Sequence, residues 1–163
     1  MASSQNPLQK SSLHARKTFG GHDQPRLLAV ANQKGGVGKT TTAINLATAL
    51  AAVGKTVLLM DLDPRGNATT GLGVRRSMIR SSSYDVLFGD AGVEESAVKT
   101  KVPRLSVVPS SIHLSGAEIE LVTAKDREYR LREALRRPMP YDYVILDCPP
   151  SLNLLTLNAL VAV

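Results

Sequence analysis

Short apolar runs separated by segments of helical spacing dominate the chain beyond residue 26. Four such runs predict strands, and they lie at 27–31, 56–60, 105–109 and 143–147. The run at 56–60 is almost entirely apolar instead of alternating, which is typical of a parallel strand covered on both faces. Strands that alternate with helices predict an α/β fold with a mostly parallel sheet and flanking helices.

Helices are predicted between these runs. Apolar residues at helical spacing cover 41–53, where Gly54 ends the pattern, and shorter stretches are expected at 84–88 and 94–99. Ser115 and Glu118 have the spacing of a capping box, so another helix is expected to begin at Ser115. A charged helix with a solvated face is expected at 126–137, and its pairs four residues apart are Asp126/Arg130, Glu128/Arg132 and Glu133/Arg137.

The length of 163 residues suits about one domain. Residues 1–25 are rich in Ser, Gln, Gly and His and show no periodicity, so we expect a flexible N-terminal extension ahead of a domain at 26–163. A partner-binding arm is the alternative for this extension.

Charge and composition narrow the class of protein. The net charge is +6, of which residues 1–26 contribute +3 through four basic residues and one acid. This balance permits contact with nucleic acid or anionic lipid without requiring either, while 4% aromatic residues and no Trp argue against a base-stacking platform. Cys148 is the single cysteine, which excludes an intramolecular disulfide and fits a reducing cytosol. No apolar run reaches the roughly 20 residues that span a bilayer, so no membrane association is expected.

Glycines and lysines between the first strand and the first helix carry the clearest chemical signal. This segment, Ala31 to Thr42, reads Ala-Asn-Gln-Lys-Gly-Gly-Val-Gly-Lys-Thr-Thr-Thr. A glycine-rich turn before a helix N-terminus presents backbone N–H groups to phosphate oxygens. Lys39 would add a charge near the β and γ phosphates, and the Thr40 hydroxyl can ligate Mg²⁺. The candidate nucleotide-binding residues are Lys34, Gly35, Gly36, Val37, Gly38, Lys39, Thr40 and Thr41.

This loop departs from the common P-loop pattern, because Gln33 stands in place of the first glycine and Lys34 follows it. With its two lysines, the loop resembles the deviant Walker A loops of the ParA/MinD superfamily of ATPases. The resemblance implies that Lys34 reaches across a dimer to the partner's nucleotide, so that Lys34 and Lys39 both serve catalysis. A glycine-rich turn without a ligand is the alternative.

Two aspartates follow the second predicted strand. Asp61 and Asp63 lie at its carboxyl end, where ligands of open α/β sheets bind. Their segment, ending at Thr69, is similar to the Walker A′ motif of ParA-type ATPases. That similarity implies that Asp63 positions or activates the attacking water and that Asp61 supports Mg²⁺. Arg65 departs from the motif, which usually has Gln there, and a polar strand end followed by a turn is the alternative reading.

The fourth predicted strand and its exit cover Tyr143 to Ser151. Apolar residues ending in Asp147 have the form of a Walker B motif, whose carboxylate holds a water of the Mg²⁺ shell. The following Asp-Cys-Pro-Pro-Ser sequence resembles the corresponding motif of the same family. The candidate metal contacts are therefore Thr40, Asp61 and Asp147.

From Leu27 to its last residue, the chain resembles the N-terminal part of ParA- or Soj-type ATPases that partition chromosomes or plasmids. The resemblance implies a P-loop NTPase-like fold, ATP and Mg²⁺ as cofactors, an ATP-driven homodimer, non-specific DNA binding by that dimer and stimulation by a ParB-type partner, in the cytoplasm at the nucleoid. It also implies truncation at the C-terminus with later strands missing. An edge strand and an apolar helix face would then be exposed, the latter formed by Leu154, Leu155, Leu157, Leu160 and Val161.

Three alternatives remain open. A MinD-like membrane-cycling ATPase would need a C-terminal amphipathic helix, which we do not find. A nitrogenase-reductase-like electron carrier would need several cysteines to hold an iron-sulfur cluster. A truncated fragment would bind nucleotide weakly without productive hydrolysis.

Overall fold

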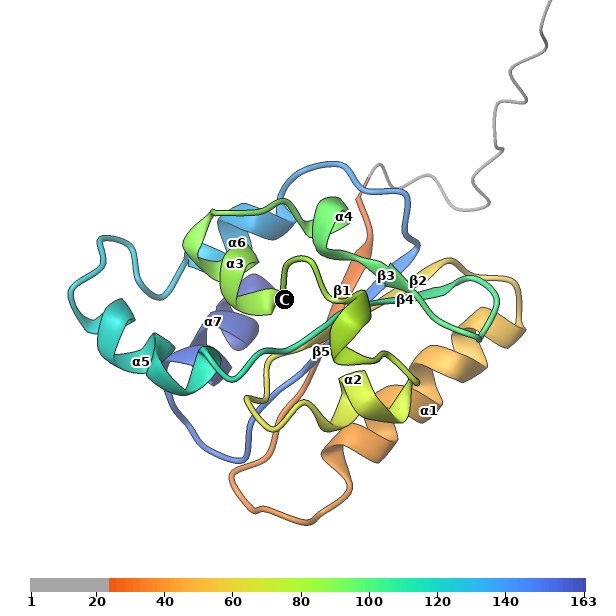
Figure 1. Cartoon of the computed structure of the whole chain (residues 1–163), viewed down its shortest axis with the longest axis horizontal. Coiled ribbons are helices and arrows are strands. Elements are labelled where there is room, and N and C mark those ends of the chain that lie inside the picture. Colours follow the sequence, from red (N-terminus) through yellow and green to blue (C-terminus); the bar gives the residue numbers. More distant parts are fainter. Residues whose placement is uncertain (1–23) are drawn as a thin grey trace, which may run out of the picture.

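The computed structural model describes residues 24–163, so the flexible extension predicted for 1–25 lies almost entirely outside the described residues. Strands and helices follow one another along this part of the chain, with one 3-10 turn (Figure 1). In chain order they are β1 (Arg26–Val30), α1 (Lys39–Ala52), β2 (Val57–Asp61), α2 (Asn67–Gly71), η1 (Arg76–Met78), α3 (Ser83–Phe88), α4 (Val93–Ser96), β3 (Val98–Lys99), β4 (Leu105–Val108), α5 (Leu114–Val122), α6 (Arg130–Leu135), β5 (Tyr143–Asp147) and α7 (Leu154–Ala162).

A single sheet forms the centre of the described part, with the strand order β1-β5-β2-β4-β3. The four longer strands pair in parallel, which confirms the predicted α/β fold with a mostly parallel sheet. β3 pairs antiparallel with β4, through Val98 with Val107 and Lys99 with Ser106. The helix predicted at 94–99 is therefore wrong at its end, because Val98 and Lys99 form backbone hydrogen bonds with the sheet edge instead of continuing a short helix.

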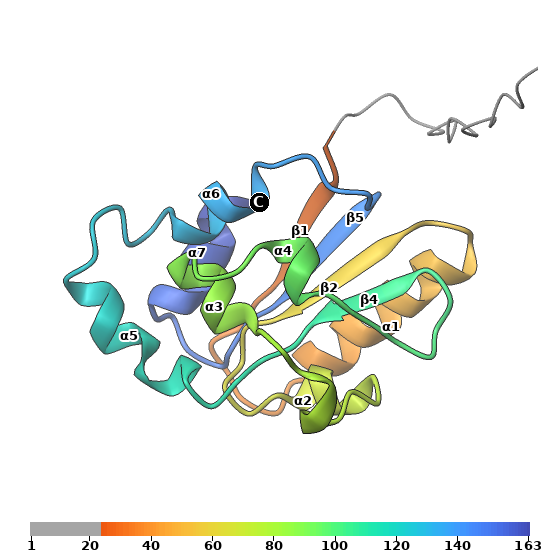
Figure 2. The ribbon, with the colours of Figure 1, turned by 45° about the horizontal axis from the view of Figure 1, so that its top comes forward.

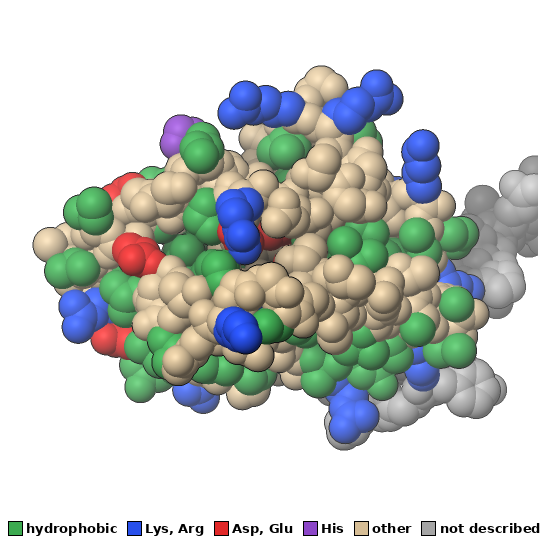
Figure 3. All heavy atoms as spheres, turned by 90° about the horizontal axis from the view of Figure 1, so that it is seen from below, with side chains coloured by type: hydrophobic (Ala, Val, Ile, Leu, Met, Phe, Trp, Pro, Cys, Tyr) green, Lys and Arg blue, Asp and Glu red, His purple; other side chains and the backbone are tan. Residues whose placement is uncertain are grey.

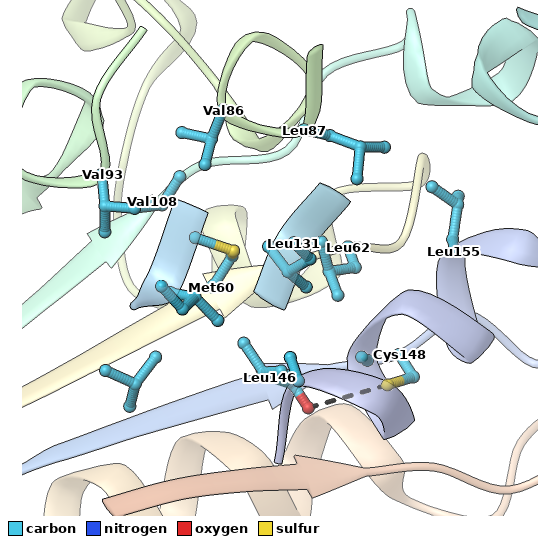
Figure 4. Close-up of a cluster of buried hydrophobic side chains, with 14 of the residues drawn as sticks. Met60, Leu62, Val86, Leu87, Val93, Val108, Leu131, Leu146, Cys148 and Leu155 are labelled. Atoms are coloured by element: carbon cyan, nitrogen blue, oxygen red, sulfur yellow. Dashed lines mark hydrogen bonds between the residues drawn. The ribbon is translucent and has the colours of Figure 1, made fainter. Parts of the chain in front are cut away.

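Two layers of helices cover opposite faces of the sheet (Figure 2). On β2, Leu58 and Met60 face the layer that contains α3, α5, α6 and α7, whereas Val57 and Leu59 face α1 and α2. Figure 4 shows the first of these cores, in which Met60 and Leu146 of the sheet meet Leu131 and Leu155 of the helices. An apolar strand with both faces buried is what the uninterrupted run at 56–60 predicted.

The alanine-rich side of α1 explains how closely that helix lies on the sheet. Ala43, Ala47 and Ala51 recur every four residues and are almost fully buried. Small side chains allow the helix backbone to approach Leu59 and Ile145, which belong to the same core. The first turn of α1 is thereby held at the carboxyl end of the strands.

The two helices after β4 differ from the sequence-based expectations. α5 begins at Leu114 without a side-chain cap, so the capping box expected from Ser115 and Glu118 does not form. Leu114 is fully buried, and its N–H donates to the carbonyl of Ser111 at 3.1 Å, so the N-cap position is His113, two residues before Ser115. Packing of a buried leucine has therefore overridden the local capping signal.

The charged segment at 126–137 is helical only over α6. Asp126 has a left-handed backbone (φ 54°), which prevents a regular helix from starting there. Asn158 of α7 accepts from the N–H of Leu131 at 3.1 Å and donates to the carbonyl of Arg127 at 2.7 Å, so a tertiary contact shapes the turn. The predicted pairs four residues apart are replaced by Arg127–Glu128 at 2.9 Å and Arg136–Glu133 at 3.0 Å.

β1 forms one edge of the sheet and is only partly covered. Leu28 is 37% exposed, and on α7 the exposed apolar residues Leu157 and Leu160 have exposed fractions of 41% and 45%. The expected exposure of the α7 face is wrong for Leu155, which is 1% exposed because it points with Ala159 into the core beneath α7. Among residues 24–163, no helix is long and apolar enough to cross a bilayer.

Candidate nucleotide-binding site

The three sequence motifs meet at the carboxyl edge of the sheet. β1, β5 and β2 are neighbours, and their register places Val30 beside Asp147 and Asp147 beside Asp61. The contacts continue past the strand ends, because Cys148 N–H donates to the carbonyl of Val30 at 3.2 Å and Leu62 N–H donates to that of Asp147 at 3.0 Å. The glycine-rich loop, the Asp61 segment and the Asp147 segment therefore leave the sheet side by side.

The loop between β1 and α1 has the backbone conformation that its glycines allow. Gly36 and Gly38 have left-handed φ values of 70° and 86°, which a residue with a Cβ adopts only at a cost. The side chain of Asn32 accepts from Lys34 N–H at 3.0 Å and tightens the start of the loop. α1 begins directly after Gly38, so its unpaired N–H groups and positive dipole end face this loop. Such an arrangement can bind phosphate groups.

Of the two loop lysines, only Lys39 is enclosed. Lys39 is 9% exposed, and its Nζ donates to the carbonyl of Lys34 at 3.1 Å. The Lys34 side chain is exposed, as are Gly35 and Val37, and Thr41 projects into solvent beside them. The structure therefore places a fixed ammonium group under the loop and a second one that is free to reach outward.

Asp147 is buried beside the first turn of α1. Its side chain is fully inaccessible, and no donor among residues 24–163 has hydrogen-bond geometry with either carboxylate oxygen. Burial raises the pKa of Asp147, and the nearby Thr40 hydroxyl and the positive charge of Lys39 lower it only in part. Burying a carboxylate that accepts no well-aligned hydrogen bond costs free energy. This indicates that a group from a ligand completes the environment of Asp147.

Asp61, the register partner of Asp147, is fully hydrogen-bonded by its own loop. One carboxylate oxygen accepts from Asp63 N–H at 3.1 Å, and the other accepts from the N–H and hydroxyl of Thr69 at 2.8 and 2.7 Å. Burial nevertheless raises the pKa of Asp61 to about 6, because desolvation outweighs these donors and the charge of Asp147 adds to it. Asp61 therefore holds the loop that follows β2, and its direct contact with a metal remains a prediction.

Asp63 is paired with Arg65. Nη2 of Arg65 lies 2.6 Å from Oδ2 of Asp63, and the aspartate side chain is only 3% exposed, compared with 56% for the arginine. The backbone around Asp63 is fixed as well, since the Ser110 hydroxyl donates to its carbonyl at 2.6 Å. Asp63 thus lies at the mouth of the site under a guanidinium group.

Sequence reasoning assigned no role to Thr69, Ser83 or Ser110, which anchor the aspartate loop. Ser83 donates its hydroxyl to the Asp61 carbonyl at 2.6 Å, and Ser110 N–H donates to the Thr69 hydroxyl at 3.0 Å. Ser110 follows β4, whose carboxyl end lies at the same sheet edge. The convergence of parallel strand ends was therefore a usable signal for Ser110, whereas Ser83 lies in a helix N-terminus that only the tertiary structure brings near.

The surface over the site has little acidic character. Figure 3 views the end of the molecule where α1 begins, at the bottom of Figure 1, and shows separate Lys and Arg side chains over a mostly uncharged surface. Asp61, Asp63 and Asp147 are all buried beneath it. An incoming anion therefore meets exposed cations first and the carboxylates only at depth.

The described residues provide only some of the ligands that a divalent cation needs. No group of three or more His, Cys, Asp or Glu within residues 24–163 could hold a metal ion. Mg²⁺ at nucleotide sites is typically bound by one or two protein groups together with phosphate oxygens and water. Thr40 and the buried oxygens of Asp147 match that donor chemistry, so these residues fit a Mg²⁺ ion that arrives with phosphate.

Cys148 follows Asp147 directly but belongs to the core. It is 1% exposed, and burial raises the pKa of its thiol to about 12. Its Sγ lies 3.9 Å from the carbonyl oxygen of Leu146, on the side of the sheet away from α1 (Figure 4). The thiol therefore has a packing role.

The fold and the phosphate-type loop define a P-loop NTPase-like α/β protein. A model of the AAA_31 protein family, described as an AAA domain, matches residues 25–163, and the chain belongs to this family.

Relatives and solved structures agree with this assignment. The chain is 61% identical over 140 residues to the chromosome partitioning protein ParA of Caulobacter vibrioides, covering 84% of this chain and 52% of that protein. It is 54% identical over 138 residues to the sporulation initiation inhibitor protein Soj of Bacillus subtilis, covering 84% and 54%. The crystal structure of cobyrinic acid a,c-diamide synthase from Mycobacterium smegmatis with bound ADP and magnesium has a TM-score of 0.80 and 46% identity, covering 85% of this chain and 57% of that one. These matches confirm the resemblance to ParA and Soj, and the chain spans about half the length of the curated relatives it matches.

Proposed function

We propose that this chain carries the nucleotide site of an ATPase that partitions DNA. The main support for the proposal is the environment of Asp147. Its carboxylate is buried beside the first turn of α1 and the glycine-rich loop, and it accepts no well-aligned hydrogen bond from residues 24–163. A phosphate-binding loop, a helix N-terminus and an unsatisfied carboxylate within reach of Thr40 are the parts that a Mg²⁺-nucleotide complex requires.

In this proposal, the loop residues bind the phosphates of ATP. The N–H groups of residues 35–41 donate to phosphate oxygens, and Lys39 neutralises charge on the β and γ phosphates after its Nζ leaves the Lys34 carbonyl. Thr40 and Asp147 would hold Mg²⁺ directly or through its water shell, and this ion would supply charge stabilisation at the phosphates. Asp61 keeps the following loop in place for Asp63.

Hydrolysis is assigned to Asp63 and Lys34. Asp63 orients or deprotonates the attacking water, since its carboxylate lies at the mouth of the site on a loop anchored by Ser110. Lys34 is exposed at the surface of the loop, which suits a role on the nucleotide of a second subunit in an ATP-dependent homodimer.

The partition role is supported by relatives named as chromosome partitioning proteins at 61% and 53% identity. Non-specific DNA binding by the dimer, stimulation by a ParB-type partner and location in the cytoplasm at the nucleoid are proposed from the same kinship. The cobyrinic acid a,c-diamide synthase shares the fold and was crystallised with ADP. The nucleotide site by itself is therefore consistent with a partition protein or with a protein of that name. The higher identity of the partition proteins favours partition.

Two substitutions separate nucleotide binding from chemistry. Lys39→Ala should abolish binding of a fluorescent ATP analogue with Mg²⁺, whereas Asp63→Asn should bind the analogue normally and hydrolyse ATP at least about 100-fold more slowly. Lys34→Ala should retain binding in the monomer and lose ATP-dependent dimerisation measured by light scattering. Equal loss of binding in the Lys39 and Asp63 variants would contradict the assigned roles, and ATP turnover that neither DNA nor a ParB-type partner changes would contradict the partition function.

A further inference from the structure

Arg65 surrounds the carboxylate of Asp63 more completely than an ordinary ion pair. Its Nε lies 3.1 Å from both Oδ1 and Oδ2, and its Nη2 lies 2.6 Å from Oδ2. Its backbone N–H donates to Oδ1 at 3.0 Å. Each oxygen of Asp63 thus lies within hydrogen-bond distance of two nitrogens of Arg65, and the single Nε–H is shared between the two oxygens.

These contacts occupy most of the hydrogen-bonding capacity of Asp63. An ionised carboxylate has about four lone-pair sites on its two oxygens. Three N–H groups of Arg65 are directed at these sites, two of them from the side chain, so the guanidinium competes with a water molecule for the carboxylate. Asp63 is therefore better able to act on water when the guanidinium has moved away.

The guanidinium can move without disturbing the loop. The Arg65 side chain is 56% exposed, while the backbone of the loop is held by the bonds from Ser110 to the Asp63 carbonyl and from Thr69 to Asp61. The backbone N–H of Arg65 would keep one contact to Oδ1 after the side chain has left. Opening the pair thus costs a side-chain rotation and the contacts of a partly exposed ion pair, about 1 kcal/mol or a fivefold change in population.

We propose that Arg65 is a positioning residue that competes with water for the carboxylate of Asp63 and thereby slows hydrolysis of ATP. This inference rests on the proposed ATPase function. In the closed arrangement the guanidinium occupies the carboxylate, and in the open arrangement Oδ2 is free to accept from the attacking water. The intrinsic turnover rate reflects the fraction of molecules in which the pair is open.

The kinetic experiment compares the purified wild-type protein with Arg65→Gln, Arg65→Lys and the control Arg76→Gln, which removes the same charge from an exposed site. Arg65→Gln should raise kcat about fivefold and leave KM for ATP within about twofold, because only the competition for Asp63 is removed. Arg65→Lys should give an intermediate kcat, since an ammonium cannot form the fork of contacts. Arg76→Gln should match the wild type.

A spectroscopic experiment tests the contact without hydrolysis. The Nε–H signal of Arg65 in ¹⁵N NMR spectra, assigned by its loss in Arg65→Gln, should be shifted and exchange slowly with solvent in the nucleotide-free protein. It should move to the position of exposed arginines in Asp63→Asn if the carboxylate holds it. A wild-type signal already at the exposed position would overturn the proposal.

These experiments distinguish failure of the role proposed for Arg65 from failure of the proposed ATPase function. Unchanged or lowered kcat in Arg65→Gln, with normal hydrolysis by the wild type, would overturn the role of Arg65 alone. Absence of Asp63-dependent hydrolysis in the wild type would overturn both this inference and the proposed function.

Discussion

At the ends of β2 and β5, Asp61 and Asp147 are register partners with fully buried side chains, yet their hydrogen bonding is opposite. Asp61 accepts three hydrogen bonds from its own loop, and Asp147 accepts none with good geometry from residues 24–163. Both follow an apolar strand, so the local sequence signal is the same. The difference teaches that one carboxylate holds the protein's own loop, whereas the other is the one that we propose for a Mg²⁺ ion.

The largest expected effect is a difference in the free energy of unfolding between variants of Asp61 and Asp147. Asp61→Ala leaves the N–H groups of Asp63 and Thr69 and the Thr69 hydroxyl without their acceptor, and should lower the free energy of unfolding by roughly 3 kcal/mol. Asp147→Ala removes a costly buried carboxylate and should change it by less than about 1 kcal/mol. Urea denaturation of both variants without nucleotide checks the comparison, and an equal loss for both would contradict it.

The pH dependence of the free energy of unfolding tests the raised pKa of Asp61. Its folded-state pKa of about 6 lies above the unfolded value near 3.8, so the folded protein binds the proton more tightly between these values. The stabilising contribution is therefore complete below about pH 4 and is lost as the pH rises through 6, a difference of about 3 kcal/mol.

Asp61→Asn provides the control, because it cannot titrate. Subtracting its unfolding free energies from those of the wild type at pH 4 to 7 isolates the Asp61 contribution. A difference that grows with rising pH would contradict the raised pKa. The raised pKa of Asp147 acts in the same direction in both proteins, so only its coupling to the charge of Asp61 survives the subtraction.

The next effect concerns Mg²⁺ at Asp147. Asp147→Asn keeps the shape of the side chain and removes its charge, so the Mg²⁺ concentration needed for half-maximal ATP hydrolysis should rise about 10- to 100-fold. Thr156→Val, at a buried position in the first turn of α7 where the hydroxyl donates to the Ser151 carbonyl, is the control and should not change the Mg²⁺ requirement. Unchanged Mg²⁺ dependence in Asp147→Asn would remove Asp147 from the metal site.

The smallest effect tests the anchor of Asp61. Thr69→Val removes the hydroxyl that donates to Asp61 and accepts from Ser110 N–H, and should cost about 1 to 2 kcal/mol of unfolding free energy. Thr70→Val, one residue along, loses only an exposed contact to the Gly66 carbonyl and should cost less than about 0.5 kcal/mol. Thermal unfolding of the two variants gives the difference directly. Equal shifts in Tm would show that the buried hydrogen bonds of Thr69 contribute no more to stability than the exposed one of Thr70.

Sequence patterns predicted the strand ends better than the region of α5 and α6. Around the strand ends, the glycine-rich loop and the positions of Asp61, Asp63 and Asp147 were predictable, because strand periodicity and the convergence of parallel strands bring such residues together. Between α5 and α6, capping and charge-pair rules failed, since buried Leu114 and the Asn158 side chain determine where the helices begin. Local rules hold where the backbone follows regular elements and fail where a tertiary contact is stronger.

Sequence alone determined the α/β class, the four parallel strands of the sheet and the loop whose glycines adopt left-handed backbone angles, because these depend on periodicity and on local sterics. Only the tertiary structure decided what each aspartate does. Thr69 and Ser110, from α2 and from the end of β4, hold the Asp61 loop, while Asp147 accepts no well-aligned hydrogen bond from residues 24–163 although the Thr40 hydroxyl lies near it. Hydrogen bonding at a buried carboxylate depends on which groups are neighbours in space, and neighbouring positions along the chain do not reveal this.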